Sequence, residues 1–207
     1  DFKTLKNLSH FSVMAIVSSS AMPISQIIIR NYITKEMNLD SAGIWQGLIR
    51  ISDGYLLMIQ ITLGTYFLPK LSAITDRFAI RKEIIDGLKF LAPLFLTMCT
   101  VIYFTRYLII DILYSEEFYP MEELFFWQLT GDFFKVISMV FSYLMISKVM
   151  TKAFIFMEIF AAVLYVVLSC ILINLMGLQG STFAFFVTYA VCFFLMLMIF
   201  RKTLFTK

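Results

Sequence analysis

Apolar residues in this chain are concentrated in six long runs that short polar segments separate. A helix needs about 17 to 25 mostly apolar residues to cross the hydrocarbon core of a bilayer. Each run meets this requirement, so each is predicted to form a membrane-spanning helix. The expected spans cover about residues 11–33, 44–68, 90–107, 124–148, 153–175 and 181–200. The predicted fold class is therefore an all-α polytopic membrane protein, with residues 1–207 forming one six-helix transmembrane lobe.

Polar residues inside several runs fall on one side of the predicted helix. In the fourth run, Gln128, Asp132 and Lys135 follow one another at spacings of four and three residues, which places them on one helix face. A charge at the bilayer centre costs at least about 2.5 to 3.5 kcal/mol, so we expect such a face to line a hydrated space and not lipid. The second run repeats the pattern at Gln46, Arg50 and Asp53.

The charges within the spans can be interpreted in two ways. They sum to zero, so they could pair with one another and fix the register of a dry bundle. Alternatively they line a substrate or ion pathway, which is the usual role of ionisable residues in membrane spans. Glutamines one turn away from several of them favour a polar cavity. The residues concerned are Arg30, Arg50, Asp53, Asp132, Lys135 and Glu158.

The residue types suggest what such a cavity would hold. Arginine presents paired donors that match the oxygens of a phosphate group. A carboxylate next to a cation, as at Asp132 and Lys135 or at Arg50 and Asp53, could bind and release a proton and so couple transport to protons. Both pairs are spaced three residues apart, so each could close within its own helix or reach across to the other.

Composition and motifs exclude several classes of protein. Hydrophobic residues make up 60% of the chain and charged residues 15%, which excludes both an ordinary soluble domain and a disordered chain. The three cysteines lie within apolar runs and a single histidine is present, so neither a disulfide framework nor a metal site or other cofactor is expected. No hydrolase, zinc-protease or P-loop motif occurs, so an enzyme is not predicted and an embedded transferase or polymerase is a minor alternative.

Basic residues predict the orientation of the spans. Twelve of them fall on the side of the two termini and two on the opposite side, so both termini are expected to be cytoplasmic. Because the basic residues gather on one side of the membrane, they give no support to nucleic-acid binding. The segment of about 79–89 carries apolar side chains at every fourth position. It is predicted to form an amphipathic cytoplasmic helix on the membrane surface. The chain starts at Asp1, so we expect it to be processed or to be part of a longer polypeptide.

Three strings resemble a known family over essentially the whole chain. They are GIWQGLIRISDGYL at 43–56, YFLPKLSAITDR at 66–77 and FFWQLTGDFFKVISMVFSYLMISK at 125–148. These resemble the second half of bacterial Wzx-type flippases, which carry lipid-linked repeat units of O-antigen and of enterobacterial common antigen. They belong to the multidrug/oligosaccharidyl-lipid/polysaccharide exporter superfamily. The resemblance implies one lobe of a twelve-helix transporter whose N-terminal six-helix lobe is missing here.

The resemblance also implies a function and an assignment of roles. The family moves undecaprenyl-pyrophosphate-linked oligosaccharide from the cytoplasmic to the periplasmic leaflet of the inner membrane by alternating access with ion coupling. Partners would be this substrate, membrane lipid, the missing lobe and a polysaccharide polymerase complex. A multidrug or cation exporter and a non-transporting interaction module remain alternatives. Substrate binding is assigned to Arg30, Gln46, Arg50, Gln128 and Lys135, and ion coupling to Asp53, Asp132 and Glu158.

Overall fold

The computed structural model describes the backbone of residues 2–205 and the side chains of residues 9–201. Within that part, six helices are long and apolar enough to cross a membrane, as predicted. The long helices are α1 (Phe2–Glu36), α2 (Leu39–Thr62), α4 (Arg77–Leu113), α5 (Glu122–Ser147), α6 (Thr151–Met176) and α7 (Gln179–Phe205). A π-helical turn (Leu63–Phe67) and the short helix α3 (Leu68–Ala73) extend α2, and a 3-10 turn (Glu116–Met121) precedes α5.

Helix caps place several boundaries outside the apolar runs. Asn38 begins α2, because its side chain accepts a hydrogen bond from the backbone N–H of Ser41 at 2.7 Å. Asp76 begins α4 in the same way, accepting from Ala79 at 2.8 Å. As a result the segment of about 79–89, predicted to be an amphipathic helix at the membrane surface, forms the first turns of α4 and continues into the span without a break.

The helix of the second span continues past residue 68, the predicted end of that span, and past the proline that follows. Proline at position 69 lacks an N–H, and its ring crowds the carbonyl four residues earlier. The π-helical turn, which ends two residues before this proline, widens the helix, and Leu68 donates its backbone N–H to the carbonyl of Leu63. The chain therefore passes Pro69 and stays helical to Ala73.

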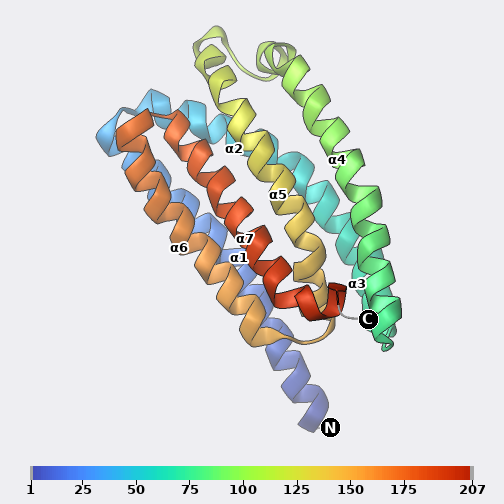
Figure 1. The fold of residues 1–207 in the computed structure, drawn as a ribbon. Coiled ribbons are helices and arrows are strands. Elements are labelled where there is room, and N and C mark those ends of the chain that lie inside the picture. Colours follow the sequence, from blue (N-terminus) through green and yellow to red (C-terminus); the bar gives the residue numbers. More distant parts are fainter. Residues whose placement is uncertain (1, 206–207) are drawn as a thin grey trace.

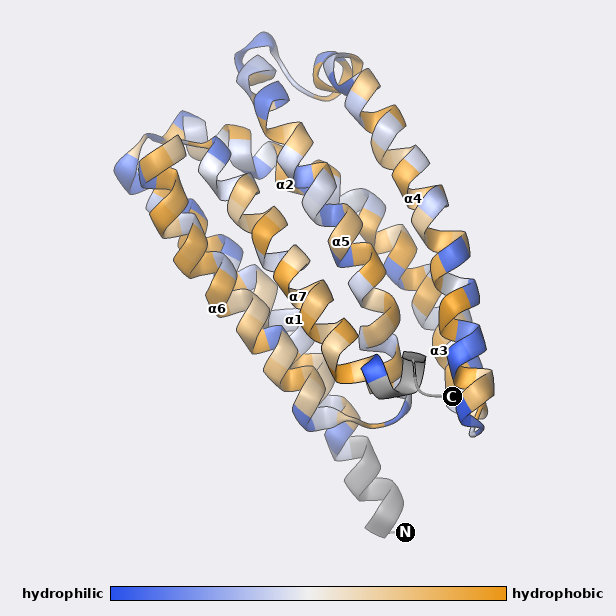
Figure 2. Cartoon of the chain, in the orientation of Figure 1, coloured by the Kyte–Doolittle hydropathy of each residue, from blue (hydrophilic) through white to orange (hydrophobic). Residues whose placement is uncertain are grey.

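Helix α5 is the centre of the lobe. It packs against α2, α3, α4, α6 and α7 (Figure 1). Helices α1 and α2 are joined at the upper end in Figure 1 and diverge toward the end where both termini lie. Figure 2 shows hydrophobic residues along the length of the helices and hydrophilic residues gathered mainly near their ends. Outward-facing residues such as Phe104, which is 76% exposed, are suited to contact with lipid.

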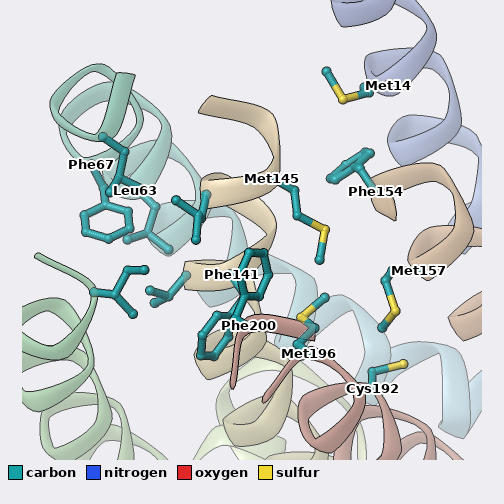
Figure 3. Packing of buried hydrophobic residues seen from close by; sticks show 14 residues of the cluster. Met14, Leu63, Phe67, Phe141, Met145, Phe154, Met157, Cys192, Met196 and Phe200 are labelled. Carbon is teal, nitrogen blue, oxygen red and sulfur yellow. The ribbon is translucent and has the colours of Figure 1, made fainter. Parts of the chain in front are cut away.

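Buried hydrophobic residues form clusters between these helices. One cluster joins α5 to α1, α4, α6 and α7 near the termini, and Figure 3 shows its sulfur-containing and aromatic side chains. Another holds α2, α4 and α5 together, and a third packs Trp45 of α2 against Tyr165 of α6 and Phe185 of α7. The core thus surrounds α5 and fixes the positions of its polar residues.

Close packing at the α6–α7 turn gives a first prediction. A Cβ atom at Gly180 would lie 2.1 Å from the carbonyl oxygen of Leu172, a backbone atom that cannot move aside. Gly180→Ala should therefore destabilise the folded protein by roughly 3 kcal/mol, measured as a lower melting temperature in detergent. Gly43→Ala is the matched control, because a Cβ there meets no atom within 4 Å. Equal melting temperatures for the two variants would contradict the packing of this turn.

Candidate functional site

Asp132 lies in a closed polar network between α5 and α2. Its side chain is 0% exposed. One carboxylate oxygen accepts hydrogen bonds from the hydroxyls of Ser52, at 2.6 Å, and Tyr55. The side-chain amide of Gln128, one turn earlier on α5, donates to the other oxygen at 3.3 Å. The expectation that Gln128 and Asp132 line a hydrated space is therefore wrong for this conformation, because neutral donors from α2 enclose the carboxylate.

Lys135 does not form the predicted ion pair with Asp132. No ion pair shorter than 4.0 Å includes either residue among the described side chains. The ammonium of Lys135 lies instead over two rings of α7, 5.5 Å from the centroid of Phe185 and 5.4 Å from that of Tyr189. A cation over desolvated aromatic faces is stabilised by about 2 kcal/mol. The short side chain of Asp132 accepts hydrogen bonds from α2, whereas the longer side chain of Lys135 reaches the rings of α7.

Lys135 lines a cavity of about 600 Å³ in the half of the lobe nearest the termini. Its walls come from α1, α2, α5, α6 and α7. This volume lies within the range of about 300 to 1,000 Å³ typical of small-molecule sites. Figure 3 shows part of the apolar wall, where side chains from three different helices gather around one region. Those residues are Met14, Phe154, Met157, Cys192 and Met196.

The cavity also carries opposite charge and polar groups. Glu158 of α6 lines it, half-buried, and forms no ion pair within 4.0 Å in the described part of the chain. Ser138, one turn after Lys135, is 4% exposed, and its hydroxyl has no hydrogen-bond partner. Gln60 of α2 also lines the cavity. The cavity therefore offers an ammonium, a carboxylate and an unused hydroxyl within a largely apolar wall.

The remaining predicted charges lie outside this cavity. Arg30 of α1, and Arg50 and Asp53 of α2, are exposed. Arg50 is about 16 Å along the axis from the start of α2, and Asp53 about 21 Å, so both lie well inside the span. Gln46 is half-buried, and its side-chain oxygen is enclosed without a partner. The structure thus divides the predicted site between the buried network, the cavity and the exposed charges of α1 and α2.

Internal pairing of the intramembrane charges is not observed. Among the described side chains, the ion pairs are Lys35 with Glu36, Lys70 with Glu83 and Arg106 with Glu122. All of these lie near helix ends. The interpretation in which the intramembrane charges neutralise one another in a dry bundle is therefore not supported by the geometry.

Sequence reasoning missed the side chains that join α5 to α2. Ser52 and Tyr55 are three residues apart on the buried face of α2 that also carries Trp45 and Leu48, so a small polar residue on an apolar face was the available signal. Closer to the C-terminal end of α5, the hydroxyl of Tyr143 donates to the carbonyl oxygen of Gln60 of α2 at 2.9 Å. Gln60 lies just before the π-helical turn.

At the end of α5, the ammonium of Lys148 donates to the carbonyl oxygens of Leu71, at 2.8 Å, and Ile74. Leu71 lies near the end of α3 and Ile74 just beyond it. Carbonyl groups at a helix end lack N–H donors from a following turn, and the ammonium supplies hydrogen bonds to these two. Together with Asp132 and Tyr143, this lysine makes α5 hold the α2–α3 segment at three levels.

Comparison with known proteins places the lobe in a family. Residues 1–123 match the family described as polysaccharide biosynthesis protein. The chain is 36% identical over 186 residues to the Lipid III flippases of Escherichia coli (strain K12) and Shigella flexneri. The match covers 90% of this chain and 45% of each flippase, so the chain spans about half the length of these relatives.

Two solved structures show the same fold at low sequence identity. The MATE transporter VcmN of Vibrio cholerae, in its bent form, matches all of this chain and 49% of its own, with a TM-score of 0.76 and 15% identity. A MOP-superfamily transporter of Pyrococcus furiosus matches 97% of this chain and 45% of its own, with a TM-score of 0.69 and 16% identity. The predicted fold, one all-helical lobe about half the length of these proteins, is confirmed. The chain, an all-helical lobe with charged residues inside its spans, belongs to the polysaccharide biosynthesis protein family.

Proposed function

We propose that this chain is one lobe of a flippase that moves undecaprenyl-pyrophosphate-linked oligosaccharide across the bacterial inner membrane. The direction would be from the cytoplasmic to the periplasmic leaflet, for O-antigen or enterobacterial common antigen. Both termini of the chain would be cytoplasmic. Support comes from the Lipid III flippases, which share 36% identity with the chain, and from the family description.

The observation that carries the proposal is the exposure of charge well inside the spans. Arg50 and Asp53 are exposed on α2 and have no ion-pair partner in the described part of the chain. Charged side chains at this depth face a protein interior or water, because contact with lipid costs several kcal/mol. Since the relatives are about twice as long as this chain, a second half could cover these charges and enclose a polar space with them.

Roles for the charged residues follow from their places in the lobe. Arg30 and Arg50 would contact the pyrophosphate from the exposed side, since guanidinium groups pair well with phosphate oxygens. Lys135 and the unused hydroxyl of Ser138 offer further donors inside the cavity. Asp53 and Glu158, which are accessible, and Asp132, which is enclosed, would be candidates for ion coupling.

A multidrug or cation exporter fits the charges less well. A cation site would be expected to hold an excess of carboxylate. Among the side chains that the structure describes, the charged residues lining the cavity are one lysine and one glutamate. The similarity to the MATE transporter shows the fold alone, because the two chains share 15% identity.

The experiment uses the full-length protein reconstituted in liposomes with a pyrophosphate-linked oligosaccharide on a polyprenol. Wild-type protein should move the substrate between leaflets. Lys135→Gln should slow this movement by roughly tenfold, the effect of one lost charge-assisted hydrogen bond, and Lys135→Arg should retain it. Lys152→Gln, an exposed lysine outside the cavity, is the matched control. Absence of movement by the wild-type protein, with export of a cationic dye in its place, would favour the exporter.

A further inference from the structure

The first turns of α4 carry a basic surface at one end of the bundle. Near Arg77–Lys89 the acidic groups are mostly occupied: Asp76 caps the helix, and Glu83 pairs with Lys70 at 2.8 Å. Arg81, Lys82 and Lys89 have no ion pair among the described side chains. Asp86 is the remaining carboxylate of the segment, so positive charge is in excess.

These cations lie at the level of the membrane boundary. Ile84 is buried in the same cluster as Leu144 and Met145, which precede the end of α5 at Ser147. By helical rise, Arg81 lies about 4.5 Å beyond Ile84, and Lys89 about 7.5 Å toward the membrane interior. A lysine at that depth extends its ammonium toward the polar layer while its carbon chain stays in the apolar one. All three charges can therefore reach the layer of lipid headgroups.

The face of α4 that carries these cations points away from the lobe, whereas the opposite face packs inward. Ile80, Ile84 and Leu88 pack inward. Lys82 and Lys89 are exposed, and Arg81 is half-buried. Phe78 is 67% exposed and Phe90 71%, so large aromatic side chains flank the cations on the outside. Lysine and arginine combined with exposed phenylalanine are typical of helices that lie at the lipid interface.

From this arrangement we infer that the basic face of α4, formed by Phe78, Arg81, Lys82 and Lys89, binds the headgroup of an anionic phospholipid such as phosphatidylglycerol. The ammonium and guanidinium groups match the phosphate oxygens, and Phe78 contacts the glycerol and upper acyl region. Anionic lipid is present in both leaflets of a bacterial inner membrane, so this inference does not depend on the orientation of the chain. It is also independent of the proposed flippase activity.

Native mass spectrometry of the full-length protein tests this inference. The protein is released from nanodiscs that contain equal amounts of phosphatidylglycerol and phosphatidylcholine, and the retained lipids are counted. Wild-type protein should retain phosphatidylglycerol preferentially. The triple variant Arg81→Gln, Lys82→Gln, Lys89→Gln should reduce that preference by about tenfold or more.

The matched control removes the same number of positive charges elsewhere. Lys35→Gln, Lys152→Gln and Arg201→Gln together change exposed residues outside the basic face and should keep the preference. A second variant, Asp86→Asn, removes the remaining acid of the segment and should increase phosphatidylglycerol retention, so the test does not rest on the triple variant alone. Equal retention of the two lipids by wild type, an equal loss in the control, or no change in Asp86→Asn would overturn the inference.

Discussion

Arg50→Ala in the full-length protein should reduce transport of the lipid-linked substrate by roughly tenfold to a hundredfold. Arg50 is exposed well inside the span and has no ion-pair partner in the described part of the chain, so its guanidinium is free to contact a phosphate. Loss of one hydrogen bond between charged groups costs about 1.5 to 3 kcal/mol, which corresponds to that range. Transport is measured as surface-glycan assembly in a bacterium that lacks its own flippase.

Stability separates this role from a structural one. Because Arg50 is exposed and forms no ion pair among the described side chains, Arg50→Ala should keep the membrane level and melting temperature of the wild-type protein. Arg50→Lys should restore part of the activity, since lysine keeps the charge but not the paired donors. Wild-type glycan assembly by Arg50→Ala would remove Arg50 from the proposed site.

Asp132→Leu is expected to have the largest effect on stability. It removes the acceptor of Ser52, Tyr55 and Gln128 in a site that is closed to water. Each buried donor left without a partner costs about 1 to 3 kcal/mol, so the total should be about 3 kcal/mol or more. The corresponding decrease in melting temperature is roughly 6 to 12 °C. Thermal unfolding in detergent, followed by circular dichroism, measures it.

Asp132→Asn distinguishes structure from ion coupling. Its amide oxygen can still accept from the hydroxyls of α2, so the melting temperature should decrease by less than half as much as in Asp132→Leu. The amide cannot release a proton, so transport should still be lost if the carboxylate carries one. Ser138→Ala is a control on the same helix, because its buried hydroxyl has no partner and its removal should not destabilise the protein. Equal melting temperatures for Asp132→Leu and wild type would show that the network does not hold α2 to α5.

The number of spans was predictable because it depends on the length of the apolar runs alone. The ends of the spans were less predictable. Asp76 begins α4 by accepting a hydrogen bond from the backbone N–H of Ala79, well before the apolar residues start. Pro69 is passed because a π-helical turn precedes it. Both effects are local backbone geometry, which hydropathy does not report.

The candidate site was predictable as a set of residues but not as a set of contacts. Helical spacing indicates that Asp132 and Lys135 are near one another on α5, but it does not indicate what faces them. Asp132 is bound by Ser52 and Tyr55, which are about 80 residues away in sequence, and Lys135 by rings of α7. These partners depend on how the helices pack, so only the structure separates the buried network from the cavity.

The charges of α1 and α2 are expected to face water within the full-length protein. Cysteine accessibility measures this directly, after Cys99, Cys170 and Cys192 are replaced by alanine. A charged thiol reagent should label Asp53→Cys, which is exposed, and should not label Phe104→Cys, whose side chain is 76% exposed on the outer side of α4. Labelling of Asp53→Cys no greater than that of Phe104→Cys would contradict the account.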